Sequence, residues 1–215
     1  MEKELETRVF SVQLESREDG EDGIISGRPI VYGARTNIGG KFDEEIAPGA
    51  LNEADLSDVR LCLNHDTSYV YARSRRNKPN STMKLMPNEF GLDIEARLAV
   101  NESPKARDYF TAVQREDIDK MSFMFSVAED EWRDLDSDHP FRIIKKIRSV
   151  VEVSAVTFPA YDTTSISARS KEALDNARSA LESARQQEAE ASEEAKRSEL
   201  ELLKEKTKIL GGKKK

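Results

Sequence analysis

The chain contains two histidines, His65 and His139, that could serve as a general base. His65 directly follows an apolar segment, residues 59–63, so we expect it at the end of a strand, where the sheet holds the backbone while the side chain can face a cleft. His139 lies in the polar stretch Asp-Ser-Asp-His-Pro and is expected to be an exposed loop residue. A metal site around His65 would need further histidine or cysteine ligands, and the chain offers only His139 and Cys62. We therefore expect neither a metal ion nor a cofactor.

Ser122 is a candidate nucleophile. It lies in the sequence Met-Ser-Phe-Met-Phe-Ser, where strand alternation would place Ser122, Met124 and Ser126 on one face and the two phenylalanines on the other. A serine hydroxyl becomes nucleophilic only when a base such as histidine takes its proton. Without that neighbour, the hydroxyl of Ser122 would face water beside a packed strand.

Glu152 is the third candidate, because its carboxylate lies among apolar residues in the segment 150–156. A buried carboxylate needs a hydrogen-bonding or charged partner. One such partner is a catalytic imidazole, which the acidic member of a triad orients. The other is an arginine such as Arg148. The residues themselves leave both possibilities open.

Cys62 is poorly suited to nucleophilic chemistry. It lies between two leucines, where a cysteine behaves as a small buried hydrophobic residue. On a strand, its odd spacing from His65 would point the two side chains to opposite faces. A single cysteine also excludes an internal disulfide and suggests a reducing compartment.

The elements that must position these residues are mostly strands. Apolar alternation and β-branched residues predict strands over residues 9–14, 24–32, 59–63, 68–72, 82–86, 91–98, 120–127, 141–147 and 149–158. The first two have hairpin-like spacing around a polar turn, residues 15–23. The strand at 68–72 is the expected partner of the strand at 59–63, and the strands at 82–86 and 91–98 predict a hairpin. Ser103 as N-cap and Pro104 in the first turn predict an amphipathic helix over residues 105–115. An α+β, mainly β body fits best, with a curved sheet or closed β-barrel-like arrangement and one or two packed helices.

Composition divides the chain near Arg169. Residues 170–215 contain no aromatic residue, proline or cysteine and carry net charge +1, whereas residues 1–169 carry net −8 and hold every aromatic residue. We expect residues 1–169 to form the functional domain and residues 170–215 to form a charged helical tail that is flexible or removable. Alanines dominate the apolar positions of the tail, so it is a solvated single helix or a weak association helix.

The charge of the body argues against a specific nucleic-acid partner, because phosphate binding is driven by lysine and arginine. The N-terminal segment is charged and has no apolar stretch typical of a signal peptide. No apolar run approaches the roughly 18 residues of a membrane span. We expect a soluble protein that is made in the cytoplasm and has no membrane partner.

Taken in order, several segments resemble the prohead proteases of tailed phages (caudoviruses), a family related in fold to the herpesvirus assemblins. The resemblance covers residues 8–168 and leaves out the tail. The matching stretches are GRPIVYG (27–33), FDEEIAPGAL (42–51), LNHD (63–66), EFGLDIEARL (89–98), the segment 106–127 ending in KMSFMFSV, and VEVSAVTFPAY (151–161).

The resemblance implies an assemblin-like serine endopeptidase with His65 as general base, Ser122 as nucleophile and Glu152 as the acidic third member. It implies that the substrates are the scaffolding segment of the major capsid protein and the protease itself, cleaved inside the immature procapsid in the host cytoplasm during prohead maturation. A homo-oligomer is left open. The alternative is a non-catalytic capsid assembly or scaffold protein of the same fold, whose tail helix binds capsid subunits.

Overall fold

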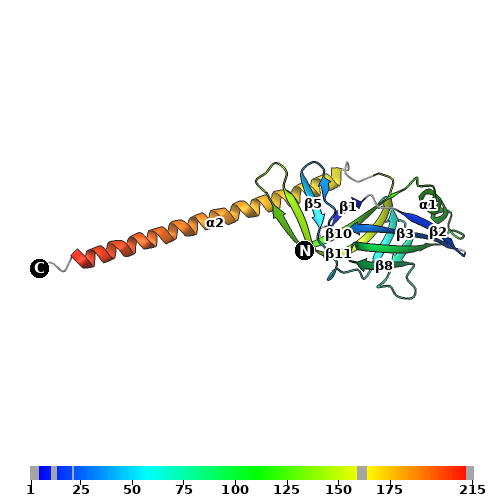
Figure 1. Cartoon of the computed structure of the whole chain (residues 1–215), viewed down its shortest axis with the longest axis horizontal. Coiled ribbons are helices and arrows are strands. Elements are labelled where there is room, and N and C mark those ends of the chain that lie inside the picture. The colour runs from blue at the N-terminus through cyan, green and yellow to red at the C-terminus, as the bar shows by residue number, and fades with distance from the viewer. Residues whose placement is uncertain (1–4, 11–13, 21, 159–163, 212–215) are drawn as a thin grey trace. The chain divides into compact units, whose positions relative to one another are not determined.

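The computed structural model describes residues 5–10, 14–20, 22–158 and 164–211 of the 215-residue chain. The chain divides into two compact units, Met1–Lys171 and Glu172–Lys215. All the strands that the described residues form belong to the first unit, which is called the body below (Figure 1). The second unit consists of most of a long helix, α2 (Thr164–Gly211).

The first sheet is built around two long antiparallel strands, β10 (Lys120–Arg133) and β11 (Phe141–Val156). Strand β1 (Glu6–Phe10) runs antiparallel along the other edge of β10. Ser122 therefore lies on a strand that has a neighbour on both sides.

The far edge of β11 carries two parallel strands, one after the other. β5 (Phe42–Ile46) pairs with the first residues of β11, and β6 (Val59–Leu63) pairs with its last residues. β4 (Thr36–Ile38) pairs with β5, and β7 (Ala72–Ser74) pairs with β6, which completes seven strands within the described part of the chain. Because β6 and β11 are parallel, the residues that follow β6 emerge beside the C-terminal end of β11.

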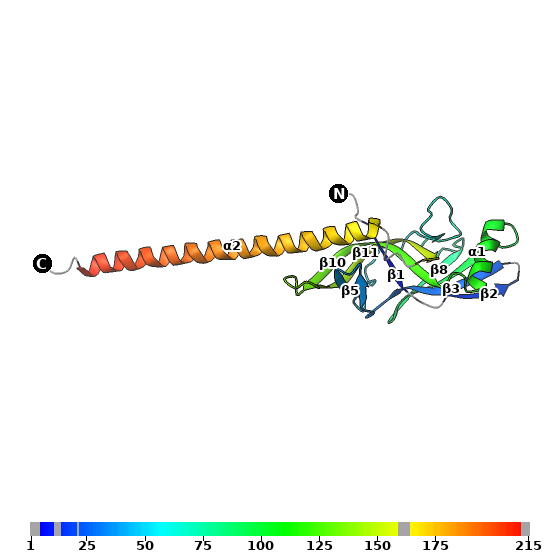
Figure 2. The same ribbon diagram turned by 90° about the horizontal axis from the view of Figure 1, so that it is seen from above.

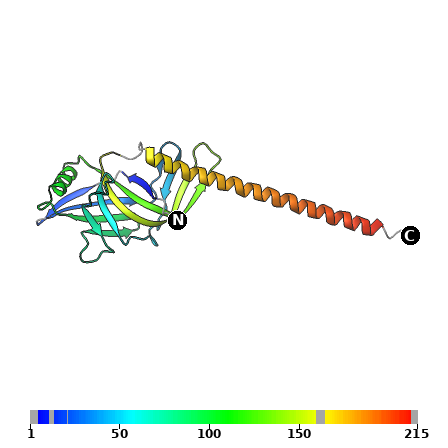
Figure 3. The same ribbon diagram turned by 180° about the vertical axis from the view of Figure 1, so that it is seen from behind.

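The second sheet is antiparallel throughout. Its order is β2 (Glu15–Asp19), β3 (Asp22–Val31), β9 (Gly91–Leu98) and β8 (Met83–Asn88). Helix α1 (Pro104–Gln114) contacts β2 and β3 at one end of the body, as Figure 2 shows, and Figure 3 shows the same end from behind.

One hydrophobic core joins both sheets and α1. It contains Phe123 and Phe125 of β10, Leu61 of β6, Ile94 of β9 and Tyr109 of α1, each no more than 2% exposed. The phenylalanines of β10 thus face the core, as their alternation with Ser122 predicts. The residues of the site lie on the opposite face of the first sheet.

The mainly β fold class is confirmed, and the closed barrel, one of the two expected arrangements, is not formed, because both sheets remain open. The helix after Ser103 is confirmed, with Ser103 accepting a hydrogen bond from the backbone N–H of Ala106 at 3.2 Å. The hairpin of β8 and β9 is confirmed as well.

Four predictions about the strands are wrong. The polar segment expected to be a turn contains β2, whose side chains are mostly exposed at a sheet edge and therefore carry no apolar pattern. The strand expected over residues 9–14 overlaps β1 only at residues 9 and 10, and residues 11–13 lie outside the described part of the chain; β1 pairs with β10 and not with β3. The partner of β6 is Ala72–Ser74 instead of residues 68–72, and the two strands expected over 141–158 are the single strand β11. The expected break fell at Arg148, but β11 continues through this residue, because Ile147 and Ser149 on either side of it both pair with β10.

The expected tail is helical. Within α2, every residue from 182 to 204 is exposed, which agrees with a segment rich in charge and alanine. Whether the tail is flexible or removable stays a prediction. No helix that the described residues form is apolar over a length sufficient to cross a membrane.

Candidate active site

His65 lies two residues beyond the end of β6 in a backbone conformation that few residue types adopt. Asn64 and His65 both have positive φ, 52° and 60°. The backbone N–H of Asn64 donates to the carbonyl of Ala155 (3.0 Å), and Asn64 Oδ1 accepts from the backbone N–H of Thr157 (2.9 Å). These contacts with the end of β11 hold the short loop that carries His65.

The side chain of His65 meets the buried carboxylate of Glu152. His65 Nδ1 and Glu152 Oε2 are 2.7 Å apart, and the Glu152 side chain is 3% exposed while that of His65 is 21% exposed. The hydroxyl of Ser154 donates to the other carboxylate oxygen of Glu152, and it accepts a hydrogen bond from the backbone N–H of His65 at 3.0 Å. Histidine, glutamate and serine thus form one hydrogen-bonded unit.

The partner at Nδ1 determines the tautomer of the neutral His65 ring. An ionised carboxylate only accepts hydrogen bonds, so Nδ1 carries the proton and Nε2 presents its lone pair. Nε2 is buried and has no hydrogen-bond partner among the described residues. The ring is therefore oriented as a general base would be, with its acceptor nitrogen directed away from the acid.

Ser122 lies on the same face as this unit, one strand away. In the β10–β11 pairing, Ser122 is directly opposite Ser154 and Met124 is opposite Glu152. Directly opposed residues of an antiparallel pair point to the same face, with Cβ atoms about 5 Å apart. Ser122 is 0% exposed, and its hydroxyl donates to the backbone carbonyl of Arg8 on β1 at 2.8 Å.

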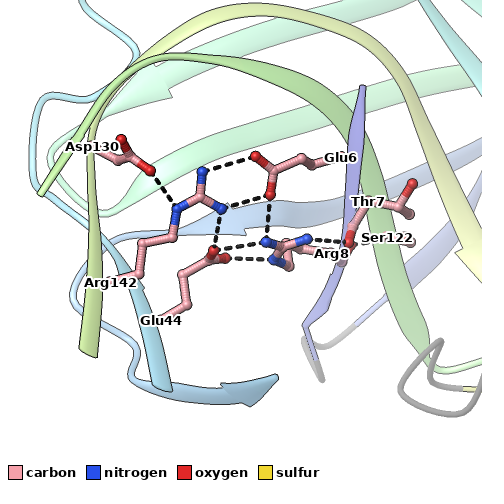
Figure 4. Close-up of polar contacts among 7 residues, drawn as sticks. All are labelled: Glu6, Thr7, Arg8, Glu44, Ser122, Asp130 and Arg142. Atoms are coloured by element: carbon pink, nitrogen blue, oxygen red, sulfur yellow. Dashed lines mark hydrogen bonds and ion pairs between the residues drawn. The ribbon is translucent and has the colours of Figure 1, made fainter. Parts of the chain in front are cut away.

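A buried ion-pair network holds β1 in this position (Figure 4). The guanidinium of Arg8 binds Glu44 of β5 through Nε (2.5 Å) and Nη2 (2.7 Å), and Nη2 also binds Glu6 (2.6 Å). Arg142 of β11 binds Glu6 through Nη1 (2.7 Å) and Nη2 (2.9 Å), Glu44 through Nη1 (3.0 Å) and Asp130 through Nε (2.6 Å). The network therefore connects β1 to β5, β10 and β11 beside the carbonyl that Ser122 contacts.

The charges of the network compensate for its burial. Burial alone would raise the pKa of Glu6, but Arg8 and Arg142 outweigh this effect and lower that pKa from 4.5 to about 2. Burial likewise opposes the charge of Arg8, yet Glu44 and Glu6 raise its pKa. The four most buried members, Glu6, Arg8, Glu44 and Arg142, have side chains 3–12% exposed.

The other candidate residues lie apart from this unit or are chemically unsuited. Within the described part of the chain, the hydrogen bonds and ion pairs of Glu152 join it to His65 and Ser154, not to Arg148. His139 is exposed and binds Asp43 at 2.8 Å. Cys62 is buried, and this burial, helped by the charge of Glu152, raises the pKa of its thiol to about 12. The described residues contain no group of three or more His, Cys, Asp or Glu side chains arranged to hold a metal ion.

Two features of the site are absent from the predictions made from the sequence. Ser154 lies two residues after Glu152 on a strand, so alternation alone predicts that the two side chains point to the same face. The network of Glu6, Arg8, Glu44 and Arg142 gave no comparable signal, because its members come from three strands far apart in the sequence.

The fold and the site define a mainly β protein with a histidine–carboxylate pair beside two serines, an arrangement of the kind that serine hydrolases use. The chain belongs to the Caudovirus prohead serine protease family, whose profile matches residues 10–178. It is similar to the prohead protease of Enterobacteria phage HK97, with 31% identity over 153 residues. The aligned region covers 70% of this chain and 61% of the length of that relative. No solved structure matches the chain, so the expected likeness to assemblins stays a prediction.

Proposed function

We propose that the chain is a serine endopeptidase that cleaves the scaffolding segment of the major capsid protein, and its own chain, during phage prohead maturation. Membership of the prohead serine protease family supports the reaction class. The observation that carries the assignment to particular residues is the 2.7 Å contact of His65 Nδ1 with buried Glu152, which leaves Nε2 as an acceptor without a hydrogen-bond partner among the described residues. Ser122 lies on β10, the strand that pairs with the strand of Glu152. His65 is the general base, Ser122 the nucleophile and Glu152 the acid that orients the base.

In the acylation step, Ser122 Oγ attacks the carbonyl carbon of the scissile peptide and its proton moves to His65 Nε2. Glu152 stabilises the imidazolium through the hydrogen bond from Nδ1. The tetrahedral intermediate then breaks its C–N bond, and the leaving amine takes the proton from Nε2. Water attacks the acyl-enzyme in the second half-reaction, with the same histidine first accepting and then returning a proton.

The hydroxyl of Ser122 has to change its partner before this chemistry can begin. In the structure it donates to the Arg8 carbonyl at 2.8 Å. Rotation about the Cα–Cβ bond would redirect it, and staggered rotamers give it a small number of discrete positions. Because Ser122 is 0% exposed, substrate binding must also open the face on which it lies.

The proposed setting is the inside of the immature procapsid in the host cytoplasm, where the protease and its substrate are packaged together. Enclosure raises the effective concentration of the substrate, so little intrinsic affinity is needed. The tail of residues 170–215 would serve packing or targeting and could itself be removed by cleavage. A homo-oligomer is compatible with this proposal.

The test is co-expression of the chain with its capsid protein, followed by mass measurement of the capsid protein. The parent should release a scaffolding fragment, and Ser122→Ala should leave the capsid protein intact. The matched control is Ser126→Ala, which removes another buried hydroxyl of β10, one that bonds to Ser149 at 2.8 Å. Cleavage by Ser122→Ala at the rate of Ser126→Ala would rule out Ser122 as the nucleophile.

The complete burial of Ser122 favours a second candidate, a non-catalytic assembly protein that kept the fold and binds capsid subunits through its tail helix. A serine-directed fluorophosphonate, added while the chain is co-expressed with its capsid protein so that substrate can open the face of Ser122, separates the two candidates. It should label the parent at Ser122 if the chain is a protease, and it should label neither the parent nor Ser122→Ala if the chain only assembles capsids.

A further inference from the structure

We propose that Ser154 is the positioning residue of this site: it holds the His65 backbone and the Glu152 carboxylate in one fixed geometry. This inference rests on the proposed protease function for its kinetic consequence, although the geometry can be tested without any substrate. Ser154 itself would not touch the substrate. It acts through the two residues that set the orientation of the base.

The Ser154 hydroxyl acts both as a donor and as an acceptor inside the site. Its single hydroxyl proton goes to Glu152 Oε1, and one of its two acceptor positions takes the backbone N–H of His65 at 3.0 Å. The side chain is 0% exposed, so water does not compete for these contacts. Hydrogen bonds to ionised groups are roughly twice as strong as neutral ones, which makes the bond to the carboxylate the stronger of the two.

The His65 loop needs such a contact because its backbone is strained. Two consecutive residues other than glycine, Asn64 and His65, have positive φ. Conformations of this kind persist only where the surroundings hold them in place. Asn64 is held by Ala155 and Thr157, whereas the backbone N–H of His65 is held by Ser154.

Ser154 therefore links Glu152 to His65 a second time, through hydrogen bonds that do not involve the imidazole ring. One of these bonds goes to Oε1 of the carboxylate, and the other comes from the backbone from which the imidazole projects. Loss of the hydroxyl would remove the acceptor of the His65 backbone N–H and would free the carboxylate to rotate. The ring could then turn Nε2 away from the position in which it can meet Ser122.

The same contacts argue that Ser154 is not the nucleophile, although it lies directly opposite Ser122. Its proton is donated to a carboxylate, and the base nitrogen of His65 has no hydrogen bond to it. Ser122 differs, because its hydroxyl donates to a neutral backbone carbonyl that it can leave by rotation.

The first experiment follows the Nδ1 proton of His65 by proton NMR of the full chain. A histidine N–H donating to a buried carboxylate gives a resonance far downfield of ordinary amides, and His139→Gln assigns it, because the chain has only two histidines. We expect Ser154→Ala to lose this resonance or broaden it by exchange with water. Ser126→Ala, which removes a buried hydroxyl from the Ser126–Ser149 pair, should keep it.

The second experiment measures kcat and KM for cleavage of a capsid-derived substrate. Ser154→Ala should lower kcat by up to about 100-fold with KM little changed, since small misplacements of a catalytic group have effects of this size. The acid limb of its pH–rate profile should also move. Ser126→Ala should match the parent in kcat, in KM and in its pH–rate profile, even if it lowers the melting temperature as much as Ser154→Ala does.

A second variant, Ser154→Cys, covers the case in which Ser154→Ala does not fold. The thiol has nearly the same shape but is a weak donor and acceptor, so the resonance and kcat should both fall. The proposal is overturned if a folded Ser154 variant keeps the downfield resonance and the parental kcat. If the parent itself fails to cleave any capsid substrate, the protease proposal fails and the NMR result still decides the positioning role.

Discussion

At the scale of single residues, the candidate site is built around the hydrogen bonds of the two carboxylate oxygens of Glu152. Glu152 gives one oxygen to the His65 ring and the other to Ser154. A charge buried to this extent is stable only when its partners are in place. In the proposed site, Glu152 therefore contributes to the fold as well as to the orientation of the base, and experiments have to separate the two contributions.

Glu152→Gln separates them, because it keeps the shape and removes the charge. If Glu152 orients His65, turnover should fall by a large factor, up to about the 10⁴ measured for the corresponding change in a serine-protease triad, while the protein remains folded. The measurements are melting temperature and capsid-protein cleavage on one sample. A folded variant that cleaves at close to the parental rate would remove Glu152 from the site and leave His65 and Ser122 as a dyad.

Cys62 is predicted to take no part in the cleavage reaction. Its thiol pKa is about 12, raised by burial and by Glu152, so almost no thiolate exists at neutral pH. Cys62→Ala should cleave the capsid protein at the parental rate, and the native chain should react with a maleimide only after unfolding. Rapid maleimide labelling of the folded parent, with loss of cleavage, would contradict the assignment of Ser122 as nucleophile.

At the scale of elements, buried ion pairs attach β1 to the rest of the first sheet. β1 contributes Glu6 and Arg8 to the ion-pair network, and it contributes the carbonyl that accepts the Ser122 hydroxyl. Removing one partner of a buried pair leaves an uncompensated charge, which is far more costly than losing a surface pair. The attachment of β1 should therefore be sensitive to acid and to neutralising substitutions.

Glu6→Gln tests this sensitivity. The pKa of Glu6 is lowered from 4.5 to about 2, so its ionised form stabilises the folded body above about pH 4.5 and this stabilisation is lost as the pH falls toward 2. At pH 7 we expect Glu6→Gln to lower the free energy of unfolding by about 3 kcal/mol. The difference from the parent should shrink between pH 4.5 and pH 2.5, because the parent then protonates the same group.

Urea unfolding at pH 7, 4.5, 3.5 and 2.5 measures this difference. The control is Glu131→Gln, in which an exposed carboxylate paired with Arg133 and Lys145 is neutralised. An exposed pair contributes about 0–1 kcal/mol, so the control should stay near the parent at every pH. Equal effects of the two substitutions at pH 7 would mean that the network does not stabilise the body.

At the scale of the whole molecule, the body and the tail differ in how much of each is buried. The core lies in the first unit, whereas residues 182–204 of α2 are exposed throughout. A segment that buries nothing contributes little to folding stability.

Truncation after Glu182 should leave the melting temperature within about 1 °C of the parent, because it removes exposed residues and a segment that contains no aromatic residue. Truncation after Ala168, which removes the whole charged tail of residues 170–215, serves as the comparison. Differential scanning fluorimetry of the three proteins at equal concentration measures both effects. A melting temperature many degrees lower for the chain truncated after Glu182 would show that the distal tail is part of the folded unit.

Local sequence determined those features that depend on neighbours in the chain. Alternation in β10 predicted which of its side chains face the core, the Ser103 cap predicted where α1 begins, and the apolar run before His65 predicted the end of β6. Each of these follows from a short-range period or a single turn of backbone. The loss of aromatic residues after residue 169 likewise predicted that the core lies in the body.

Only the tertiary structure decided which strands are neighbours and hence which side chains meet. The pairing of Ser122 with Ser154, the contact of His65 with Glu152, and the binding of Arg8 to Glu44 join residues 32, 87 and 36 positions apart. Strand order and register carry no local signature, because any strand with a suitable face can pair with another. The polar edge strand β2 was missed for a related reason, since an exposed strand needs no apolar alternation. The candidate residues of the site could thus be proposed from the sequence, whereas their partners and hydrogen bonds came from the packing of strands that are far apart in the chain.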